Sequence, residues 1–329
     1  MINKKLDSLE LLRGIAVIAV CFCHFGHALS SGNAFAKMFD AFHVYGAYGV
    51  QIFFVVSGFV IPLSLHKSRY NFSHYGLFLL KRLARLHPPY LFALVLSFII
   101  GYASYRMRGL DFPETIESIL LSMFYLHISE INPVFWTLVV EAQYYLLIGL
   151  GFVWLTKYPR LFLIVGMPII ILISQSPISG YIRLFEFINY FLIGVVGFLI
   201  YAKLGSLRLN IAGLIGILLI DFAIYDLAPV VASLLTICVI LFFRFPIPAG
   251  IAFPGKISYS LYLIHYPIGV KFINLLVRYV SPSLSWVLFP IAIILVTVIA
   301  WLFWKIIENP SAELSSSVKY KTSPQIAMV

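Results

Sequence analysis

The feature that most constrains the fold is a succession of apolar stretches, each about as long as a bilayer is thick. Residues 90–105 (YLFALVLSFIIGYASY) and 287–304 (VLFPIAIILVTVIAWLFW) contain no charged side chain, and about 20 such residues let a helix cross the hydrocarbon core. Only 11% of the 329 residues are charged, against about 25% in soluble domains. The sequence therefore excludes a large soluble protein and predicts an all-α, polytopic integral membrane protein.

The apolar stretches predict about ten transmembrane helices, an even number that places both termini on one side of the membrane. The predicted spans are residues 11–30, 46–65, 89–106, 134–155, 161–175, 185–202, 210–226, 228–243, 257–277 and 285–304. Residues 115–128 (TIESILLSMFYLHI) are short and partly polar, so we expect an interfacial or re-entrant helix there. The first span follows a start that resembles a signal peptide, but it lacks a cleavage pattern and is expected to be retained.

The basic residues predict the orientation. If both termini are cytoplasmic, 17 of the 23 Lys and Arg residues fall on the cytoplasmic side, as the positive-inside rule requires. This bias explains the net charge of +10 without a nucleic-acid partner. We therefore expect a multi-pass membrane protein with a transmembrane domain over 1–310 and a short, polar, disordered cytoplasmic tail over 311–329.

Ionisable residues within predicted spans are expensive and mark candidate sites. Arg13 and His24 lie 11 residues apart in the first span, so they share a helical face with a rise of roughly 16 Å between them. Glu141 lies seven residues into the fourth span, at a depth that counting along the helices makes similar to that of His24. The sequence thus predicts that Glu141 orients His24, which would then act as a general base on an alcohol.

Each of these residues also has a purely structural interpretation. His24 alone is consistent with hydrogen bonding between helices, and Arg13 alone with a side chain that snorkels to the surface. Cys21 shares the face of His24 and would be a thiol nucleophile or, more simply, a small buried hydrophobe. No cysteine spacing typical of zinc is present, and we expect no metal.

Two further clusters carry polar groups. The segment FLLKRLARLHPPY places Arg82 and Arg85 on one helical face, where they would clamp phosphates or simply supply positive-inside charge, and its two prolines are expected to end that helix. The segment ISYSLYLIHYP places Ser258, Tyr262 and His265 at helical spacing, either for binding or for helix packing.

Six segments, in this order along the chain, resemble those of the acyltransferase-3 family, the membrane O-acyltransferases that decorate bacterial surface sugars. They are LELLRGIAVIAVCFCHF, GVQIFFVVSGFVI, FLLKRLARLHPPY, FWTLVVEAQYYL, ISYSLYLIHYP and the closing ENP. Each segment is weakly specific alone, but the ordered set is specific. Many relatives carry an acidic residue where this chain has Gln51, so we expect no proton transfer there.

The resemblance implies transfer of an acyl group, usually acetyl, from cytoplasmic acyl-CoA to a sugar hydroxyl at the outer face. It implies ten spans in the bacterial cytoplasmic (inner) membrane, with both termini inside. Some relatives carry a fused periplasmic hydrolase-like domain that this chain lacks, so we expect one polypeptide to perform both delivery and transfer. The family's functional pattern falls on residues that we group by expected role: His24 and Glu141 for catalysis; Arg13, Arg82 and Arg85 for binding the donor; and Ser57, Trp136, Tyr262 and His265 for substrate or oxyanion contacts.

The expected mechanism is direct attack of an acceptor hydroxyl on the thioester, with His24 as base. A covalent acyl-His24 relay is the main variant. Acyl-CoA would be a co-substrate rather than a bound cofactor, and the other expected partners are a sugar or polysaccharide acceptor and membrane lipid. Alternatives from other functional classes are a transporter or flippase for a glycan or glycolipid, and a sensor or scaffold.

Overall fold

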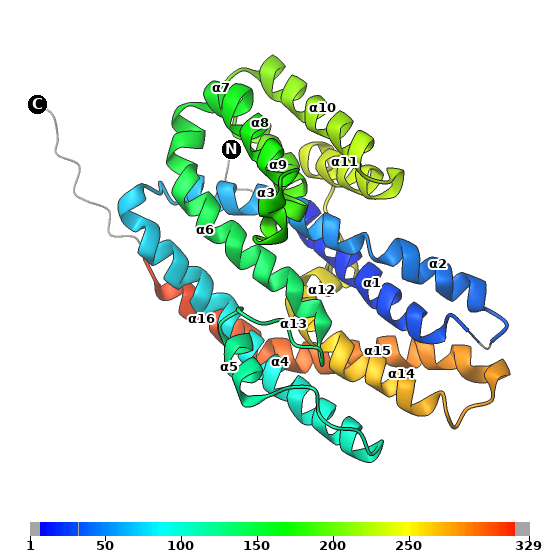
Figure 1. The fold of residues 1–329 in the computed structure, drawn as a ribbon. Coiled ribbons are helices and arrows are strands. Elements are labelled where there is room, and N and C mark those ends of the chain that lie inside the picture. The colour runs from blue at the N-terminus through cyan, green and yellow to red at the C-terminus, as the bar shows by residue number, and fades with distance from the viewer. Residues whose placement is uncertain (1–6, 32, 320–329) are drawn as a thin grey trace, which may run out of the picture.

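A computed structural model describes residues 7–31 and 33–319, and within these ranges all regular structure is helical (Figure 1). The helices are α1 (Asp7–Leu29), α2 (Ala36–Gly46), α3 (Gly49–Lys67), α4 (Tyr75–Met107), α5 (Ile116–Met123), α6 (Trp136–Lys157), α7 (Pro159–Leu161), α8 (Met167–Ser174), α9 (Leu184–Tyr201), α10 (Leu207–Ile224), α11 (Leu227–Phe242), α12 (Ala249–Lys256), α13 (Ser258–Ile264), α14 (Lys271–Leu276), α15 (Leu288–Phe303) and α16 (Asn309–Ser317). The all-α, polytopic prediction is confirmed.

Seven helical stretches in the described ranges are long and apolar enough to cross a membrane. They are Asp7–Leu29, Ala36–Lys67, Phe72–Met107, Pro133–Lys157, Leu184–Tyr201, Leu207–Ile224 and Pro282–Ser317. Two shorter apolar helices cover Pro159–Ser174 and Leu227–Phe242, and α13 and α14 are joined by a π-helical segment, His265–Val270. Helix therefore occupies every predicted span, whereas the count of ten crossings and the cytoplasmic termini stay predictions.

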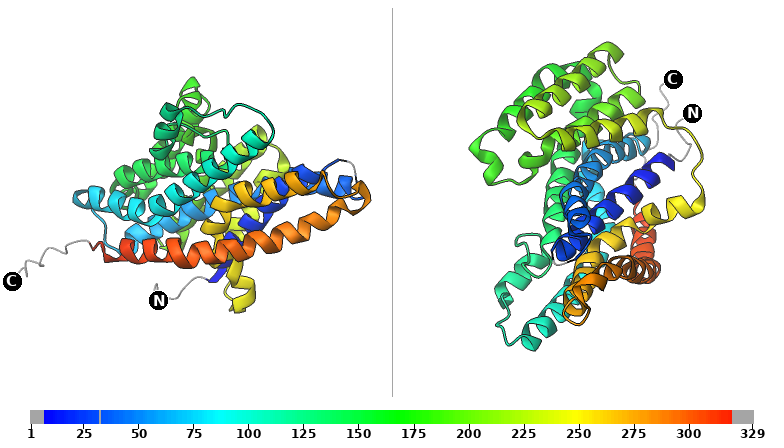
Figure 2. Two further views of the ribbon diagram at one scale, coloured as in Figure 1. Left: turned by 90° about the horizontal axis from the view of Figure 1, so that it is seen from below. Right: turned by 90° about the vertical axis from the view of Figure 1, so that its right-hand side faces the viewer.

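The helices form one bundle with α1, α3 and α6 at its centre. Helices α7–α11 lie on one side of this centre and α13–α16 on the other, as two views of the ribbon agree (Figures 1 and 2). Helices α3 and α9 approach unusually closely because glycines face each other: a Cβ on Gly58 would lie 2.2 Å from the Phe191 carbonyl oxygen, and one on Gly194 would lie 2.2 Å from that of Val55.

Helix α4 corrects the expectation that Pro88 and Pro89 end a helix, because it runs unbroken through both of them. Each proline removes one backbone hydrogen bond, but prolines are tolerated inside membrane helices where neighbouring helices hold the backbone in place. Here the Tyr259 hydroxyl donates to the Leu86 carbonyl at 2.8 Å beside the proline pair. One continuous helix therefore carries Arg82 and Arg85 into the bundle.

The connection between α4 and α6 folds back into the bundle. Its helix α5 has only eight residues and cannot span a bilayer. At its tip, the Tyr125 ring stacks on Tyr90 at 4.6 Å, and the Tyr125 hydroxyl lies 3.2 Å from His87 Nδ1. Tyr90 is 17 residues before the end of α4 at Met107, roughly 26 Å along the helix, so this tip reaches deep beside α4, as the re-entrant alternative predicts.

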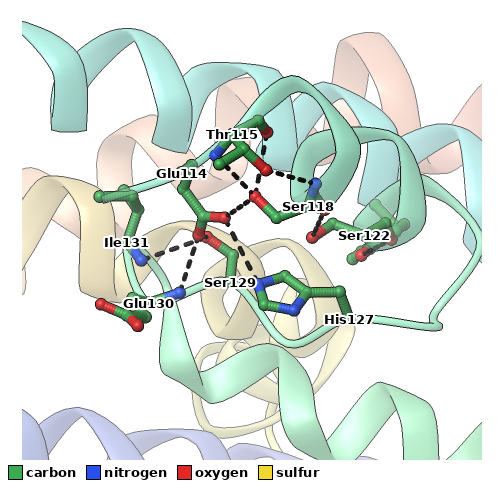
Figure 3. Close-up of polar contacts among 9 residues, drawn as sticks. Glu114, Thr115, Ser118, Ser122, His127, Ser129, Glu130 and Ile131 are labelled. Atoms are coloured by element: carbon green, nitrogen blue, oxygen red, sulfur yellow. Dashed lines mark hydrogen bonds and ion pairs between the residues drawn. The ribbon is translucent and has the colours of Figure 1, made fainter. Parts of the chain in front are cut away.

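The Glu114 carboxylate joins the two arms of this re-entrant segment (Figure 3). One oxygen accepts hydrogen bonds from Ser129 Oγ (2.6 Å) and the Glu130 backbone N–H (2.9 Å), and the other accepts one from Ser118 Oγ (2.5 Å) and lies 3.4 Å from His127 Nε2. Burial alone would raise the pKa of Glu114, but these donors and His127 outweigh it and hold that pKa below its ordinary value.

The segment after Glu308 also differs from the expectation. Residues 311–317 were expected to begin a disordered tail, but they belong to α16, which packs along α4. Ser315 Oγ donates to the Lys81 carbonyl at 2.8 Å, and Lys81 Nζ donates to the Val318 carbonyl at 3.2 Å. Docking of polar side chains on α4, a contact distant in sequence, orders this stretch. The rest of the predicted tail, 320–329, lies outside the described residues.

Candidate active site

A cavity of about 220 Å³ lies at the centre of the bundle, between α1, α3, α4, α6 and α13. Six charged side chains line it: Glu10, Arg13, Arg82, Arg85, Glu141 and Glu308. The remaining lining is mostly apolar, with a few hydroxyl groups. Charged groups are costly inside a membrane bundle and are kept there for function, so this cavity is the candidate active site.

Two helices supply the three arginines. Arg13 comes from α1, and Arg82 and Arg85 come from α4, one turn apart on one face. Arg82 donates to Ser64 Oγ at 3.3 Å, and its guanidinium lies 5.9 Å from the centre of the Tyr145 ring. The sequence predicted the pairing of Arg82 with Arg85. The meeting of this pair with Arg13 in one cavity makes a site suited to a polyanion.

Glu141 is fixed in the same cavity by two hydroxyl groups. Its Oε1 accepts a hydrogen bond from Ser57 Oγ of α3 at 3.1 Å and a short one from the Tyr145 hydroxyl, one turn further along α6. The two bonds hold the carboxylate in place beside the three arginines. Ser57 and Glu141, both predicted as site residues, therefore line this cavity. We call it the arginine cavity, after Arg13, Arg82 and Arg85.

His24 lies elsewhere. Its ring centre is 5.2 Å from that of His265 and 5.4 Å from that of Tyr266, and His24 is absent from the residues that line the cavity. The structure thus does not bring His24 and Glu141 into one cavity. Depth counted from the start of α6 was misleading, because Glu141 lines the cavity that Arg13 also lines, and His24 does not.

Tyr262 connects the two regions. Tyr262 lines the cavity, and its hydroxyl donates to the Val134 carbonyl at 2.9 Å and lies 2.6 Å from Thr137 Oγ1. Its ring centre lies 5.6 Å from that of His265. A chain of neighbouring rings therefore leads from Tyr262, at one end of the cavity, through His265 to His24.

His265 and Ser258 carry buried polar atoms with no hydrogen-bond partner among the described residues. His265 Nδ1 lies 2.7 Å from the Tyr262 carbonyl, which leaves its Nε2 unpartnered. The Ser258 hydroxyl lines the arginine cavity. Buried polar atoms normally have partners, so both are available to a ligand.

Trp136, by contrast, does not line the cavity. Its ring lies 4.7 Å from that of Phe187 and 6.0 Å from that of Phe54, and the Arg183 guanidinium lies 5.9 Å from its centre. The structure therefore places Trp136 in an aromatic cluster between α3, α6 and α9. The described residues contain no group of three His, Cys, Asp or Glu side chains that could hold a metal ion.

Glu308 is a cavity residue to which the sequence assigned no role. It is 7% exposed, and its Oε2 accepts hydrogen bonds from the Ser260 backbone N–H at 3.0 Å and from Ser260 Oγ at 2.5 Å. The signal was present, because Glu308 opens the ENP segment. Glu308 reaches the cavity because the end of the last long helix lies near the start of α1. The spacing of residues in the sequence does not predict this packing.

Comparisons with known proteins agree on one family. A model of an acyltransferase domain matches residues 6–305. The O-acetyltransferase OatA of Staphylococcus aureus (strain NCTC 8325 / PS 47) is 27% identical over 361 residues, which cover 93% of this chain and 57% of that protein. OatA of the strains COL and MRSA252 matches with the same figures. The chain thus spans little more than half the length of these curated relatives. No solved structure matches the chain.

Proposed function

The chain belongs to the acyltransferase-3 family of acyl-transferring enzymes, and from this membership we propose that it moves an acyl group from cytoplasmic acyl-CoA to a sugar hydroxyl at the outer face of the bacterial cytoplasmic membrane. The similar proteins from Staphylococcus aureus are O-acetyltransferases, which supports O-acetyl transfer. The single observation that carries the donor assignment is the convergence of Arg13, Arg82 and Arg85 on one cavity.

In this proposal the arginines bind the phosphates of the donor. CoA carries several phosphate groups, and arginine forks bind phosphate oxygens in a bidentate manner. A cavity of about 220 Å³ is smaller than the roughly 300–1,000 Å³ typical of ligand sites. It would therefore take the narrow arm of the donor while the nucleotide stays at the mouth, near Glu10.

The arm would carry the thioester toward Tyr262, at the end of the cavity nearest His265. The acceptor hydroxyl would enter from the outer side, past His24 and His265. The hydroxyl oxygen forms a bond to the thioester carbonyl carbon, the carbon–sulfur bond breaks, and the hydroxyl proton passes to His24 and finally to the CoA thiolate. Positioning of the two reactants accounts for much of the acceleration.

The remaining cavity groups have supporting roles in this scheme. Tyr262 would donate to the developing oxyanion by exchanging its bond to the Val134 carbonyl, and Ser57 by exchanging its bond to Glu141. Glu141 and Glu308 hold the arginines in a balanced electrostatic environment, so that the site is stable before the donor arrives.

Binding of the donor tests this proposal most simply. Protein in lipid nanodiscs would be titrated with CoA, and the double variant Arg82→Gln/Arg85→Gln compared with wild type. Charge-assisted hydrogen bonds contribute about 1.5–3 kcal/mol each, so affinity should fall at least tenfold. Arg208→Gln, an exposed arginine on α10 outside the cavity, is the matched control and should bind normally.

Equal CoA affinity in the double variant would refute the donor site. Wild-type protein that binds sugar but consumes no acyl-CoA would favour a transporter instead.

A further inference from the structure

A second cavity, of about 680 Å³, lies on the other side of Glu141. It runs between α4 and α6 and is bounded by the tip of the re-entrant segment, and we call it the lateral groove. The residues that line it without reaching the arginine cavity are Leu79, Leu80, Leu83, Phe124, Tyr125, Leu126, Val139, Ala142, Gln143 and Leu146. Its volume is within the range of ligand sites.

The lateral groove is apolar and opens sideways. Leu80 and Leu83 on α4 are each 50% exposed, and Leu146 on α6 is 48% exposed. Both helices belong to candidate membrane spans, and these exposed leucines give the opening an apolar rim. The only charged side chains in the lining are Arg82 and Glu141, and both lie at its inner end.

That inner end is a wall common to both cavities. Arg82, Leu86, Leu138, Glu141, Tyr145 and Tyr259 line the arginine cavity and the lateral groove alike. Leu138 follows Thr137, whose hydroxyl bonds to Tyr262, so the wall adjoins the point where the thioester is proposed to lie. A molecule at this wall would have a polyanionic side and a hydrocarbon side.

We propose that the lateral groove binds the hydrocarbon chain of an acyl donor longer than acetyl. This inference rests on the proposed function and extends it to the length of the acyl group. The arginines hold the CoA end, the thioester lies at the common wall, and the chain turns between Leu86 and Leu138 into the groove. An acetyl group has one methyl group beyond its carbonyl and would leave the groove to lipid.

Two features favour a donor chain over the tail of a lipid-linked acceptor. The groove shares six lining residues with the arginine cavity, whereas its lining does not include His24 or His265, beside which the acceptor is proposed to enter. The groove also presents no charged group away from the wall, so an anionic lipid head has no partner there.

Chain-length preference tests the proposal directly. Transfer rates from acetyl-, octanoyl- and palmitoyl-CoA would be compared in wild type and in Ala142→Trp and Val139→Phe, which fill the groove. We expect wild type to use octanoyl-CoA, and the ratio of kcat/KM for octanoyl-CoA over acetyl-CoA to fall at least tenfold in the variants. Leu150→Trp, on the exposed face of α6 outside the groove, should keep the wild-type ratio.

If the groove-filling variants fail to fold, a binding measurement still tests the groove. It also distinguishes failure of this inference from failure of the proposed function. In Leu83→Cys, octanoyl-CoA should slow labelling of the new thiol by N-ethylmaleimide at least fivefold relative to acetyl-CoA. Equal labelling, or an unchanged ratio in both filled variants, would overturn the lateral groove as an acyl site. Failure to consume any acyl-CoA would instead overturn the proposed function.

Discussion

Glu141 shows how much one side chain organises. Its carboxylate joins α3 to α6 through Ser57 and holds the buried Tyr145 hydroxyl, beside three arginines. Its neighbours therefore depend both on its capacity to accept hydrogen bonds and on its charge, and substitutions can separate these two properties.

Glu141→Ala should lower stability, because it leaves the Tyr145 and Ser57 hydroxyls without their acceptor, at a cost of about 1–3 kcal/mol. Glu141→Gln keeps an acceptor oxygen and should stay within ~1 kcal/mol of wild type while losing acyl transfer. Thermal unfolding in detergent, followed by a transfer assay, checks both variants. Full activity in Glu141→Gln would show that the negative charge is not needed.

His24→Ala should abolish transfer while CoA still binds, because His24 lies outside the arginine cavity. A loss of at least 100-fold is expected for a general base. His27→Ala removes an exposed histidine one turn away, whose ring contacts His43, and serves as the matched control. Retained transfer in His24→Ala would assign the base elsewhere.

At the residue scale, the sequence predicted several of the polar side chains that line the cavity, but not which of them lie together. Arg82, Arg85, Glu141 and Tyr262 all line the cavity, since charges in a bilayer span are seldom accidental. Depth could not be predicted, because it depends on where each helix begins within the bundle. The same uncertainty hid Glu308, which reaches the cavity only through the packing of the last helix.

At the element scale, close helix packing explains two glycines of α3 and α9. Gly58→Ala should destabilise the protein by about 1–3 kcal/mol, the cost of overpacking, because its Cβ would meet the backbone of Phe191. Gly216→Ala on α10 has no atom within 4 Å of its Cβ and should gain up to ~1 kcal/mol of helix propensity. Unfolding midpoints measured side by side check both, and equal midpoints would contradict the close contact.

The re-entrant segment should respond to pH through Glu114. A carboxyl whose pKa is lowered on folding contributes stability above its unfolded pKa and loses it as pH falls through the folded value. Protease cleavage within residues 108–132 should therefore accelerate below about pH 4.5, the ordinary value for Glu. Glu114→Gln should be cleaved faster at neutral pH as well, and a cleavage rate independent of pH and of this substitution would contradict the role of Glu114.

The elements themselves were largely predictable, because long apolar stretches have few alternatives to helix. Two features were not. The helix through Pro88 and Pro89 is stabilised by its neighbours, and α16 by its docking on α4. Both depend on contacts that are distant in sequence, whereas predictions from prolines and polar residues use only the neighbouring sequence.

At the scale of the whole molecule, the bundle places the arginine cavity toward the helix ends that carry Glu10 and Glu308, and the pair of His24 and His265 toward the opposite ends. Such an arrangement suits a donor and an acceptor that arrive from different sides of the membrane. The lateral groove adds a third opening, between α4 and α6, on the other side of the common wall.

Sided transfer tests the central claim most directly. Protein would be inserted into sealed vesicles, with acyl-CoA supplied to one face and a sugar acceptor to the other, and acyl ester and released CoA would be measured together. The account predicts equal amounts of both products, formed only when acyl-CoA contacts the face with the mouth of the arginine cavity. Equal transfer from either face, or no CoA release from fully inserted protein, would contradict it.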